Sequence, residues 1–517
     1  MKTIYYKKVP ALGFEKNGRF YIYDRYSNKI ISVPQIIYLI LDDLVSLDVN
    51  CLIEKYGDSI EEDDIRRLVS TFKSIQDREN VLFPMTMNKF SLSDSISTTD
   101  KVVYKLSHEI TFLCISLTEQ CNLRCSYCIY SGKYKSVRTH NNNGVVDWET
   151  VKSAIDYFIL CSTESKYRRI GFYGGEPLLN YKILEKAVIY AKSKCSNYLF
   201  TVTTNGTLLT NKVIDFLVQN DVRITISLDG PKEIHDSNRK TGNGAGSYLG
   251  VMKNINYIKE TYPEYFGRYL GFSVTISPQK DILPRLISFF NTVDFPSLKN
   301  EGNMTVQWVN PEENEYYKEV DYRKWARKME VEIQQYFKKV HLDGVENVHD
   351  LSPVLKAMSY YKEMSYFHLR ENLLFDKYTH YWPNGSCIPG MRSIFLTGKG
   401  QFYPCEKLYD IGEFQIGDVS TGLDTDNIIK LIDSYCDKIV DLCSTCWAFR
   451  LCGECWTSTL KNGEISCKER ARVCKLEKKY WANNISNYID ILECDPNAFD
   501  YLRVKDKPLF MSNMLKD

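Results

Sequence analysis

Strand-like and helix-like segments alternate between residues 107 and 310, and this alternation restricts the possible fold more than any other feature of the chain. The strand-like segments are ITFLCISLT, RIGFYG, LFTVTTNG, VRITISLDG, GFSVTISP and MTVQWVN. Segments with helical spacing of apolar residues, such as VDWETVKSAIDYFIL and NKVIDFLVQN, lie between them. We expect Asp147 to cap the first of these helices. Strands that alternate with helices form parallel sheets with right-handed crossovers. We therefore expect an α/β fold built on a partial (β/α)6 barrel or a strongly curved open sheet.

Polar or glycine-rich sequences follow four of these strands. CNLRCSYC at 121–128 follows the first strand, and GGEP at 174–177 follows the second. TTNG at 203–206 ends the third, and SLDGP at 227–231 ends the fourth. Ligands bind at the carboxyl ends of the strands in sheets of this kind. The four segments are therefore expected to form one site.

The chain has 17 cysteines among 517 residues, and they are unevenly distributed. Three lie within 121–128 and nine within 387–474. In a reducing compartment, clustered cysteines bind metal more often than they form disulfides. The other five are scattered, and we expect them to have structural roles: Cys51, Cys114, Cys161, Cys195 and Cys494.

The composition gives no indication that the protein binds nucleic acid or a membrane. The net charge is +1, so no overall field attracts nucleic acid or a membrane surface. The N-terminal sequence lacks the apolar core of a signal peptide, and no apolar run reaches the roughly 18 residues of a membrane span. We expect a cytoplasmic protein that binds neither nucleic acid nor a membrane.

The three cysteines of the first cluster, Cys121, Cys125 and Cys128, have the spacing Cys-x3-Cys-x2-Cys. Three cysteines on one loop can ligate three irons of a 4Fe-4S cluster and leave the fourth iron open to a small molecule. Zinc is the alternative, but a structural zinc ion usually takes four protein ligands. The only nearby histidine is His140, which follows Cys128 by twelve residues.

This motif, placed directly after the first barrel strand and with an aromatic residue at Tyr127, resembles the radical S-adenosylmethionine superfamily. GFYGGEP resembles its glycine-glycine-glutamate segment, and ISLDGPKEIHDSNR resembles the members that modify peptides and proteins. The resemblance covers roughly 110–310. It implies a 4Fe-4S cluster whose open iron chelates S-adenosylmethionine. One electron then cleaves the sulfonium, and the resulting 5′-deoxyadenosyl radical abstracts a substrate hydrogen.

The resemblance also implies contacts to S-adenosylmethionine. Gly174 and Gly175 would let the backbone approach the methionine moiety, and Glu176 would accept hydrogen bonds from its ammonium group. The remaining implied contacts are Asn205, Ser227 and Arg239 to the ribose or carboxylate, and Tyr127 near the adenine. No catalytic residue is assigned beyond the cluster.

These residues also have ordinary structural interpretations. Glu176 can instead cap the following helix, and Asn205 with the glycine after it is a common turn. His235 and Arg239, four residues apart, also fit a solvated helical face.

The second cysteine-rich segment has glycine and proline turns and, as we interpret it, little periodicity, so we expect metal to hold it together. Its central motif, CSTCWAFRLCGEC at 443–455, resembles the SPASM domain, which holds up to two auxiliary 4Fe-4S clusters. The resemblance implies an outer and an inner cluster. The outer ligands would be Cys443, Cys446, Cys452 and Cys474, and the inner ligands Cys387, Cys405 and Cys455.

The motif departs from the SPASM pattern in two places. Its last step is x2, where the family usually has x3, and THYWPNGS at 379–386 lacks an upstream cysteine that some members have. The inner cluster would then keep an open iron, able to bind a substrate thiolate, unless Cys436 or Cys467 completes it. Taken alone, 443–455 fits a zinc ribbon equally well. Because the motif follows a segment that resembles a radical S-adenosylmethionine core, we favour an iron–sulfur cluster over zinc.

The sequence divides into six predicted segments. Residues 1–85 contain GRFYIYDRYSNKIISVP, which predicts two β segments joined by a polar turn at 25–28, and two helical segments, QIIYLILDDL and IEEDDIRRLVSTFKSIQ. They resemble the winged-helix module with which maturases of ribosomally made peptides bind a leader peptide by strand addition. Their alternative role is a packing extension of the barrel. The other segments are a linker at 86–106, the barrel at 107–310, a helical bridge at 311–386, a cysteine-rich domain at 387–480, and a helix end and tail at 481–517. RARVCKLEKKYWANNISNYIDILE predicts a closing helix across the last boundary.

The combined pattern predicts an enzyme that installs a crosslink, first of all a cysteine thioether, in a ribosomally made precursor peptide. A carbon–carbon crosslinking maturase and an anaerobic sulfatase-maturing type of enzyme are alternatives of the same class. A zinc-stabilised scaffold without catalysis is the alternative of another class. The enzymatic hypothesis implies S-adenosylmethionine as cofactor, one radical 4Fe-4S cluster and two auxiliary 4Fe-4S clusters. It also implies an electron donor such as flavodoxin or ferredoxin.

Overall fold

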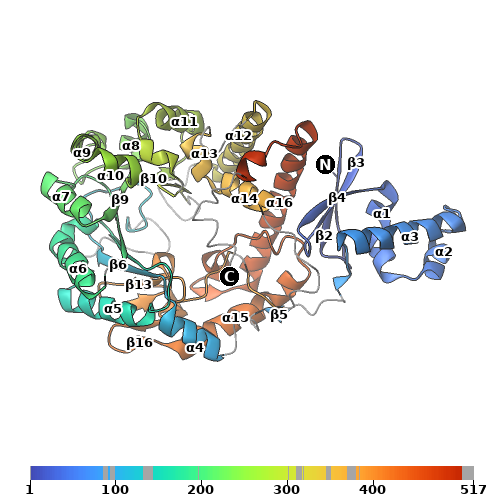
Figure 1. Ribbon diagram of the computed structural model, residues 1–517, viewed down its shortest axis with the longest axis horizontal. Coiled ribbons are helices and arrows are strands. Elements are labelled where there is room, and N and C mark those ends of the chain that lie inside the picture. The colour runs from blue at the N-terminus through green and yellow to red at the C-terminus, as the bar shows by residue number, and fades with distance from the viewer. Residues whose placement is uncertain are drawn as a thin grey trace. The chain divides into compact units, whose positions relative to one another are not determined.

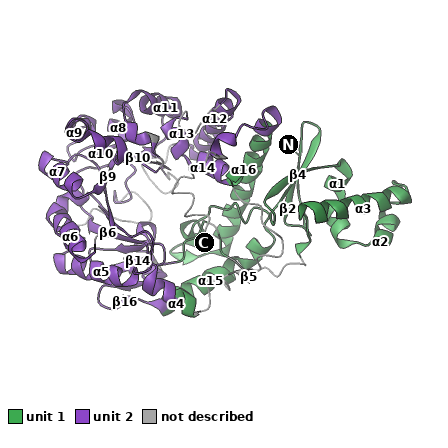
Figure 2. Cartoon of the chain, viewed as in Figure 1, with its two compact units in different colours: residues 1–102, 367–388, 426–490 green, residues 103–366, 389–425, 491–517 purple. Residues whose placement is uncertain are grey.

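The computed structural model describes residues 2–85, 91–92, 99–131, 144–195, 197–300, 302–309, 317, 320–344, 351–369, 380–383 and 385–503. The chain forms two compact units, each assembled from segments that are distant in sequence (Figure 2). Unit 1 comprises Met1–Val102, Phe367–Ile388 and Asp426–Asp490, and unit 2 comprises Val103–Tyr366, Pro389–Thr425 and Ile491–Asp517. In the ranges given above, no helix has the length and apolarity needed to cross a membrane.

Unit 2 is built on a sheet whose first six strands are neighbours in chain order and run parallel (Figure 1). They are β6 (Phe112–Thr118), β7 (Arg169–Gly174), β8 (Leu199–Thr204), β9 (Val222–Ser227), β10 (Gly271–Ile276) and β11 (Met304–Trp308). Their apolar residues are mostly buried, as expected for parallel strands covered by helices. The predicted α/β core of six strands is confirmed.

The helices that connect these strands surround the sheet on its outer side (Figure 1). They are α5 (Trp148–Cys161), α6 (Tyr181–Lys194), α7 (Asn211–Gln219), α8 (Lys232–Asn238), α9 (Tyr248–Thr261), α10 (Pro263–Arg268) and α11 (Ile282–Thr292). The expected cap of α5 is present, because the Asp147 carboxylate accepts from the backbone N–H of Thr150 at 2.8 Å. Sequence periodicity and capping therefore position the helix that follows the cysteine loop.

The sheet continues beyond β6 with strands that the sequence did not indicate. β13 (Ile394–Leu396) lies parallel to β6, and Phe395 pairs with Cys114. Three antiparallel strands follow: β14 (Gln401–Tyr403), β15 (Gly417–Asp418) and β16 (Gly422–Leu423). Strands of two or three residues are too short to show an alternating pattern. Part of the cysteine-rich segment thus extends the barrel sheet.

The predicted helical bridge contains α12 (Tyr322–Leu342), α13 (Pro353–Ala357) and α14 (Ser359–Leu369). Met329, Ile333, Phe337 and His341 form the buried face of α12 at a spacing of four residues. His341 also makes a hydrogen bond of 2.8 Å to the hydroxyl of Tyr501. This contact fixes the end of the described chain against α12.

The N-terminal part of unit 1 is a four-stranded antiparallel sheet followed by three helices. The strands are β1 (Thr3–Tyr5), β2 (Ala11–Lys16), β3 (Arg19–Asp24) and β4 (Lys29–Val33), and the helices are α1 (Gln35–Ser46), α2 (Val49–Tyr56) and α3 (Glu62–Glu79). The predicted hairpin is β3–β4, and the two predicted helices are α1 and α3. β1, β2 and α2 are additions, and Ile22, Leu41 and Phe72 share one apolar core.

Two long helices organise the cysteine-rich part of unit 1. α16 (Cys467–Cys494) confirms the predicted closing helix. α15 (Thr425–Ser444) was not expected, so the prediction of little periodicity is wrong for this stretch. Its buried face carries Ile428, Leu431, Tyr435 and Ile439, which is an ordinary amphipathic pattern. A short hairpin, β17 (Leu460–Lys461) and β18 (Glu464–Ile465), precedes α16.

The described part of the predicted linker at 86–106 lies in regular secondary structure. Its last residues belong to α4 (Thr99–His108), because valine and leucine spaced for a helix follow the polar stretch. β5 (Ser91–Leu92) pairs with β12 (His380–Tyr381). Residues 86–90 and 93–98 of the predicted linker lie outside the described residues.

The scattered cysteines have different environments. Cys114 and Cys161 are buried, as expected for small apolar side chains. Cys51 and Cys494 are exposed, so the expectation of a packing role is wrong for these two. Cys195 is half-buried.

Candidate active site

The cysteine loop of unit 2 lies at the carboxyl end of β6 and is held by backbone hydrogen bonds. The N–H of Arg124 donates to the carbonyl of Lys240 at 2.7 Å, and the N–H of Ser126 donates to that of Asn238 at 3.1 Å. Burial raises the pKa of the Cys121 thiol to about 11 and that of Cys125 to about 12. The thiols of Cys128 and Cys121 also raise the pKa of the Cys125 thiol electrostatically.

Tyr127, inside the loop, contacts a buried ion pair. Its hydroxyl donates to the carboxylate of Asp229, which also accepts from Nε of Arg239 at 2.9 Å. Asp229 is fully buried and Arg239 is 7% exposed. The second carboxylate oxygen of Asp229 accepts from the backbone N–H of Thr275 at 3.0 Å. The Arg239 guanidinium lies 5.4 Å from the centre of the Tyr127 ring.

This arrangement changes the interpretation of two predicted residues. Arg239 is not on a solvated helical face, and the solvated alternative is wrong for His235 too, which is fully buried. His235 bonds to the Ser247 hydroxyl at 2.9 Å. No role was predicted for Asp229, although an aspartate at the end of a buried strand is a signal for a site residue. Asp229 connects the cysteine loop to the end of β9.

Glu176 is fully buried beside the loop. Its carboxylate accepts from the hydroxyl of Thr204 at 2.7 Å and from the backbone N–H groups of Asn205 at 2.8 Å and Leu178 at 3.1 Å. The bond to Leu178 caps the short helix Pro177–Asn180, so the capping alternative is present in the structure. A carboxylate offers about four acceptor positions, so one remains for a ligand ammonium.

Asn205 connects the third strand end to the first. Its side-chain amide donates to Asn122 at 2.9 Å and reaches Sγ of Cys121 at 3.7 Å. The Asn205 carbonyl oxygen also accepts from Thr207 within the turn. The turn interpretation of Asn205 is therefore confirmed, and its side chain also contacts the cysteine loop. Ser227 ends β9 and pairs with Ser273 of β10.

Gly174 and Gly175 lie where β7 passes close to the start of the cysteine loop. A Cβ on Gly175 would lie 2.1 Å from the carbonyl oxygen of Gln120, and one on Gly174 would lie 2.3 Å from that of Thr118. Gly174 also has a φ of +125°, which side-chain-bearing residues rarely adopt. The two glycines are required by this close backbone approach.

Replacing Gly175 by alanine is expected to displace the cysteine loop and destabilise the chain by about 1–3 kcal/mol, the range for overpacking. The cause is the close contact with backbone, which cannot rotate away as a side chain can. Gly242→Ala is the matched control, because no atom lies within 4 Å of its added Cβ. Urea unfolding of both variants measures the difference, and equal midpoints would contradict the account.

The ionisation of Glu176 predicts a pH dependence. Burial raises its pKa from 4.5 to about 7, although the hydrogen bonds from Asn205, Thr204 and Leu178 oppose this. An ammonium ligand needs the ionised form, so affinity for S-adenosylmethionine should fall about tenfold per pH unit below 7. The stability of the ligand-free protein should change with pH in the opposite direction to the affinity. Between pH 4.5 and 7 the unfolded state binds fewer protons than the folded state, so stability falls as pH rises.

Equilibrium binding of S-adenosylmethionine between pH 5.5 and 8 measures this dependence. Glu176→Gln keeps the shape of the side chain and removes the titration, so its weaker binding should be nearly independent of pH over this range. A parent protein with a flat binding profile would contradict the assignment.

Four of the predicted outer ligands lie together in unit 1. Cys443 lies in the last turn of α15, Cys474 lies on α16, and Cys446 and Cys452 lie on the connection between the helices. Burial raises the pKa of the Cys443 thiol to about 12, and Cys446 and Cys474 add to this electrostatically. Cys446 in turn acts on Cys452. Each of the four thiols therefore interacts electrostatically with at least one other member of the set.

Arg25 holds the start of this motif from the N-terminal sheet. It is 2% exposed, and its guanidinium donates to the carbonyl oxygens of Cys443, Ser444 and Cys446 at 3.2, 2.7 and 3.2 Å. The sequence of 25–28 predicts only a turn and gives no signal for this role. The N-terminal sheet and the cysteine motif therefore belong to one packed unit.

The predicted inner ligands are divided between the units. Cys387 and Cys455 belong to unit 1, and Cys405 belongs to unit 2. Nε1 of Trp456 donates to the carbonyl of Cys387 at 2.7 Å, which fixes Cys387 beside the residue after Cys455. Of the two possible additional ligands, Cys436 is buried, and Cys467 is exposed with its thiol 3.1 Å from the carbonyl of Lys438.

Over the described residues, no three histidine, cysteine or carboxylate side chains converge on the position of a single ion. A 4Fe-4S cluster does not need such convergence, because each thiolate binds a different iron. The three half-buried cysteines of the loop, and the three buried and one half-buried cysteines of unit 1, have the donor chemistry of such clusters. The residues present therefore fit a radical cluster in unit 2 and an auxiliary cluster in unit 1.

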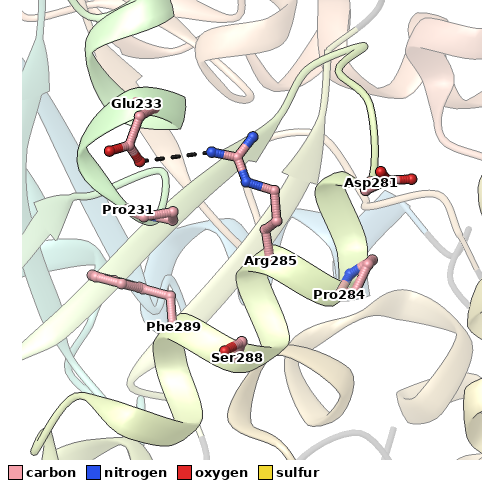
Figure 3. Close-up of a pocket in the computed structure, with 7 residues that line it drawn as sticks. All are labelled: Pro231, Glu233, Asp281, Pro284, Arg285, Ser288 and Phe289. Atoms are coloured by element: carbon pink, nitrogen blue, oxygen red, sulfur yellow. Dashed lines mark ion pairs between the residues drawn. The ribbon is translucent and has the colours of Figure 1, made fainter.

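Unit 2 also has a pocket, whose lining includes the last residue of the SLDGP segment (Figure 3). Its volume is about 680 Å³, and it is lined by Pro231, Glu233, Asp281, Pro284, Arg285, Ser288 and Phe289. Glu233 and Arg285 form an ion pair of 3.6 Å across it. None of the predicted site residues lines this pocket.

Part of the chain is similar to proteins of a known family. Residues 115–282 match the family model described as "Radical SAM superfamily". An uncharacterised protein of Methanocaldococcus jannaschii is 37% identical over 157 residues, which are 30% of this chain and 50% of that protein. The cysteine-type anaerobic sulfatase-maturating enzyme of Clostridium perfringens is 24% identical over 383 residues, or 72% of this chain and 92% of the enzyme.

A solved structure has the same fold. Native anSMEcpe with bound AdoMet and the Kp18Cys peptide superposes with a TM-score of 0.54 at 18% identity, covering 76% of this chain and 99% of that one. The match to the Methanocaldococcus jannaschii protein spans half of that relative's length. The matched region contains the cysteine loop, Glu176 and Asn205. The chain carries a domain of the Radical SAM superfamily.

Proposed function

We propose that the chain is a radical S-adenosylmethionine enzyme that abstracts a hydrogen from a ribosomally made precursor peptide and installs a cysteine thioether. The observation that carries the proposal is the grouping of Cys121, Cys125 and Cys128 beside Glu176 and Asn205 within the superfamily domain. When bound, the cluster supplies the electron that cleaves S-adenosylmethionine and starts hydrogen abstraction.

The chain's own residues would orient S-adenosylmethionine. Glu176 would accept from the ammonium group with its remaining acceptor position, and Gly174 and Gly175 would leave room for the methionine backbone. Asn205 and Ser227 would contact the ribose or carboxylate. Arg239 would act through Asp229 and Tyr127, which hold the cysteine loop in place. These assignments are part of the proposal.

Two features support a peptide as substrate. The anSMEcpe structure with the same fold holds a peptide together with AdoMet. The N-terminal sheet has edge strands at β1 and β4, and an edge strand can pair with an extended peptide. We assign leader binding to this sheet and the two auxiliary clusters to the cysteine sets named above. Flavodoxin or ferredoxin would supply electrons.

A sulfatase-maturating activity is the second candidate. It is favoured by the similarity to the Clostridium perfringens enzyme, which covers 92% of that enzyme's length. A carbon–carbon crosslinking maturase shares the same initial step and differs in the atom attacked. A zinc scaffold would contain zinc and would not cleave S-adenosylmethionine.

The test is incubation of the anaerobically reconstituted protein with S-adenosylmethionine, a reductant and short cysteine-containing peptides encoded beside its gene. A thioether maturase is expected to form 5′-deoxyadenosine and a peptide that has lost two hydrogens and one free thiol. Loss of hydrogens with all thiols retained would indicate carbon–carbon crosslinking. Modification of a sulfatase peptide in place of these precursors would favour the second candidate.

A further inference from the structure

Arg470 is a buried charge among the thiols of unit 1. It lies on α16 and is 1% exposed. Its Nη2 atom donates to Sγ of Cys452 at 3.5 Å. Within the described part of the chain, its Nε and Nη1 atoms have no hydrogen-bond acceptor. A guanidinium buried in this way has lost water without full compensation, which is unfavourable unless an anionic group faces it.

The surroundings of Arg470 identify that group. Cys474 follows Arg470 by four residues, so both lie on the same face of α16. Besides the Tyr435 hydroxyl, the groups that act most strongly on its charge are the thiols of Cys452, Cys474 and Cys443. Three of the four predicted outer ligands are therefore the electrostatic partners of this arginine.

We propose that Arg470 is a positioning residue for the outer auxiliary cluster, whose buried positive charge compensates the thiolates and raises the cluster's reduction potential. The inference rests on the outer ligand set of the proposed function. A 4Fe-4S cluster with four thiolates is negatively charged, and reduction adds another negative charge. A buried cation therefore stabilises the reduced form more than the oxidised form. Net charge and hydrogen bonds to sulfur are known determinants of cluster potential.

The chain offers a matched control on the same helix. Arg472 lies two residues further along α16, its side chain is 54% exposed, and its Nε atom pairs with Glu469 at 2.8 Å. Its charge is screened by water and by this carboxylate. Arg472→Gln therefore removes the same charge from the same helix without affecting the buried thiols.

The experiment uses the full chain, reconstituted anaerobically, in a Cys121/Cys125/Cys128→Ala background that removes the radical cluster. Redox titration with dithionite, followed by electron paramagnetic resonance, gives the midpoint potentials of the auxiliary clusters. Arg470→Gln is expected to lower one midpoint by at least about 59 mV, a tenfold change in the one-electron equilibrium constant. Arg470→Lys, which keeps the charge, and Arg472→Gln should remain near the parent.

Each result decides the inference. Unchanged midpoints in Arg470→Gln with all iron retained would overturn it. If Arg470→Gln fails to hold the outer cluster, retention in Arg470→Lys supports the charge role, and loss in both overturns it in favour of simple packing. Iron content of the parent is measured first. A parent without auxiliary iron would overturn the proposed ligand set, and the inference with it, before any arginine variant is compared.

Discussion

Replacing Cys121, Cys125 and Cys128 together by alanine is expected to abolish reductive cleavage of S-adenosylmethionine and to remove about four irons per chain, the content of one cubane cluster. The three thiols lie on one loop at the carboxyl end of β6, and each would bind a different iron. Formation of 5′-deoxyadenosine by the reconstituted variant should fall to the level without enzyme. Iron, sulfide and 5′-deoxyadenosine are measured on the same samples.

A variant with three other cysteines replaced is the control. Cys51 and Cys494 are exposed and Cys195 is half-buried, and none belongs to a predicted ligand set. Their combined replacement by alanine should leave iron content and cleavage at the parent level. Residual cleavage in the first variant, or equal iron loss in both, would show that the loop does not hold the radical cluster.

Replacing Asp229 by asparagine is expected to destabilise unit 2 by about 3–5 kcal/mol, the usual effect of removing one partner of a buried ion pair. Asp229 is fully buried and bonds to Arg239, Tyr127 and the backbone of Thr275. Asparagine preserves the shape but leaves the Arg239 charge uncompensated. The cysteine loop should loosen as well, so iron retention should fall. Urea unfolding and iron content measure the two effects.

An exposed pair supplies the comparison for Asp229. Lys259 and Asp294 are 2.7 Å apart with side chains 43% and 75% exposed, so Asp294→Asn should change stability by about 1 kcal/mol or less. The double variant Asp229→Asn/Arg239→Gln should be less unstable than the sum of the single changes, because the unpaired charge is removed. Additive effects in the double variant would contradict the coupling of these residues.

The sequence predicted the part of the fold that has regular periodicity. Six strands with helices between them were recognisable because apolar residues recur with the spacing of each element, and Asp147 capped α5 as expected. β13 was not recognisable, since three residues carry no period and its pairing with β6 is made by tertiary contacts. α15 was predictable in principle, because its apolar residues have ordinary helical spacing, but its segment was predicted to have little periodicity.

The candidate site was predictable where residue type alone limits the chemistry, as with the clustered cysteines and the paired glycines. Buried partners were harder to find. Arg25 acts through contacts with residues distant in sequence and is not distinctive in its local sequence. Asp229 also acts through distant residues, and its place at the end of a buried strand was the only sequence signal for it. Arg470 had a weak signal, its spacing of four from Cys474 on a predicted helix. Burial of the charge became apparent only in the folded structure.

The most direct test of the central claim is the metal content of the anaerobically reconstituted parent protein. One radical cluster and two auxiliary clusters predict about twelve irons and twelve sulfides per chain, with little zinc. The protein should also form 5′-deoxyadenosine from S-adenosylmethionine under reducing conditions. Stoichiometric zinc with little iron, and no cleavage, would contradict the account and make the cysteine loop a structural metal site.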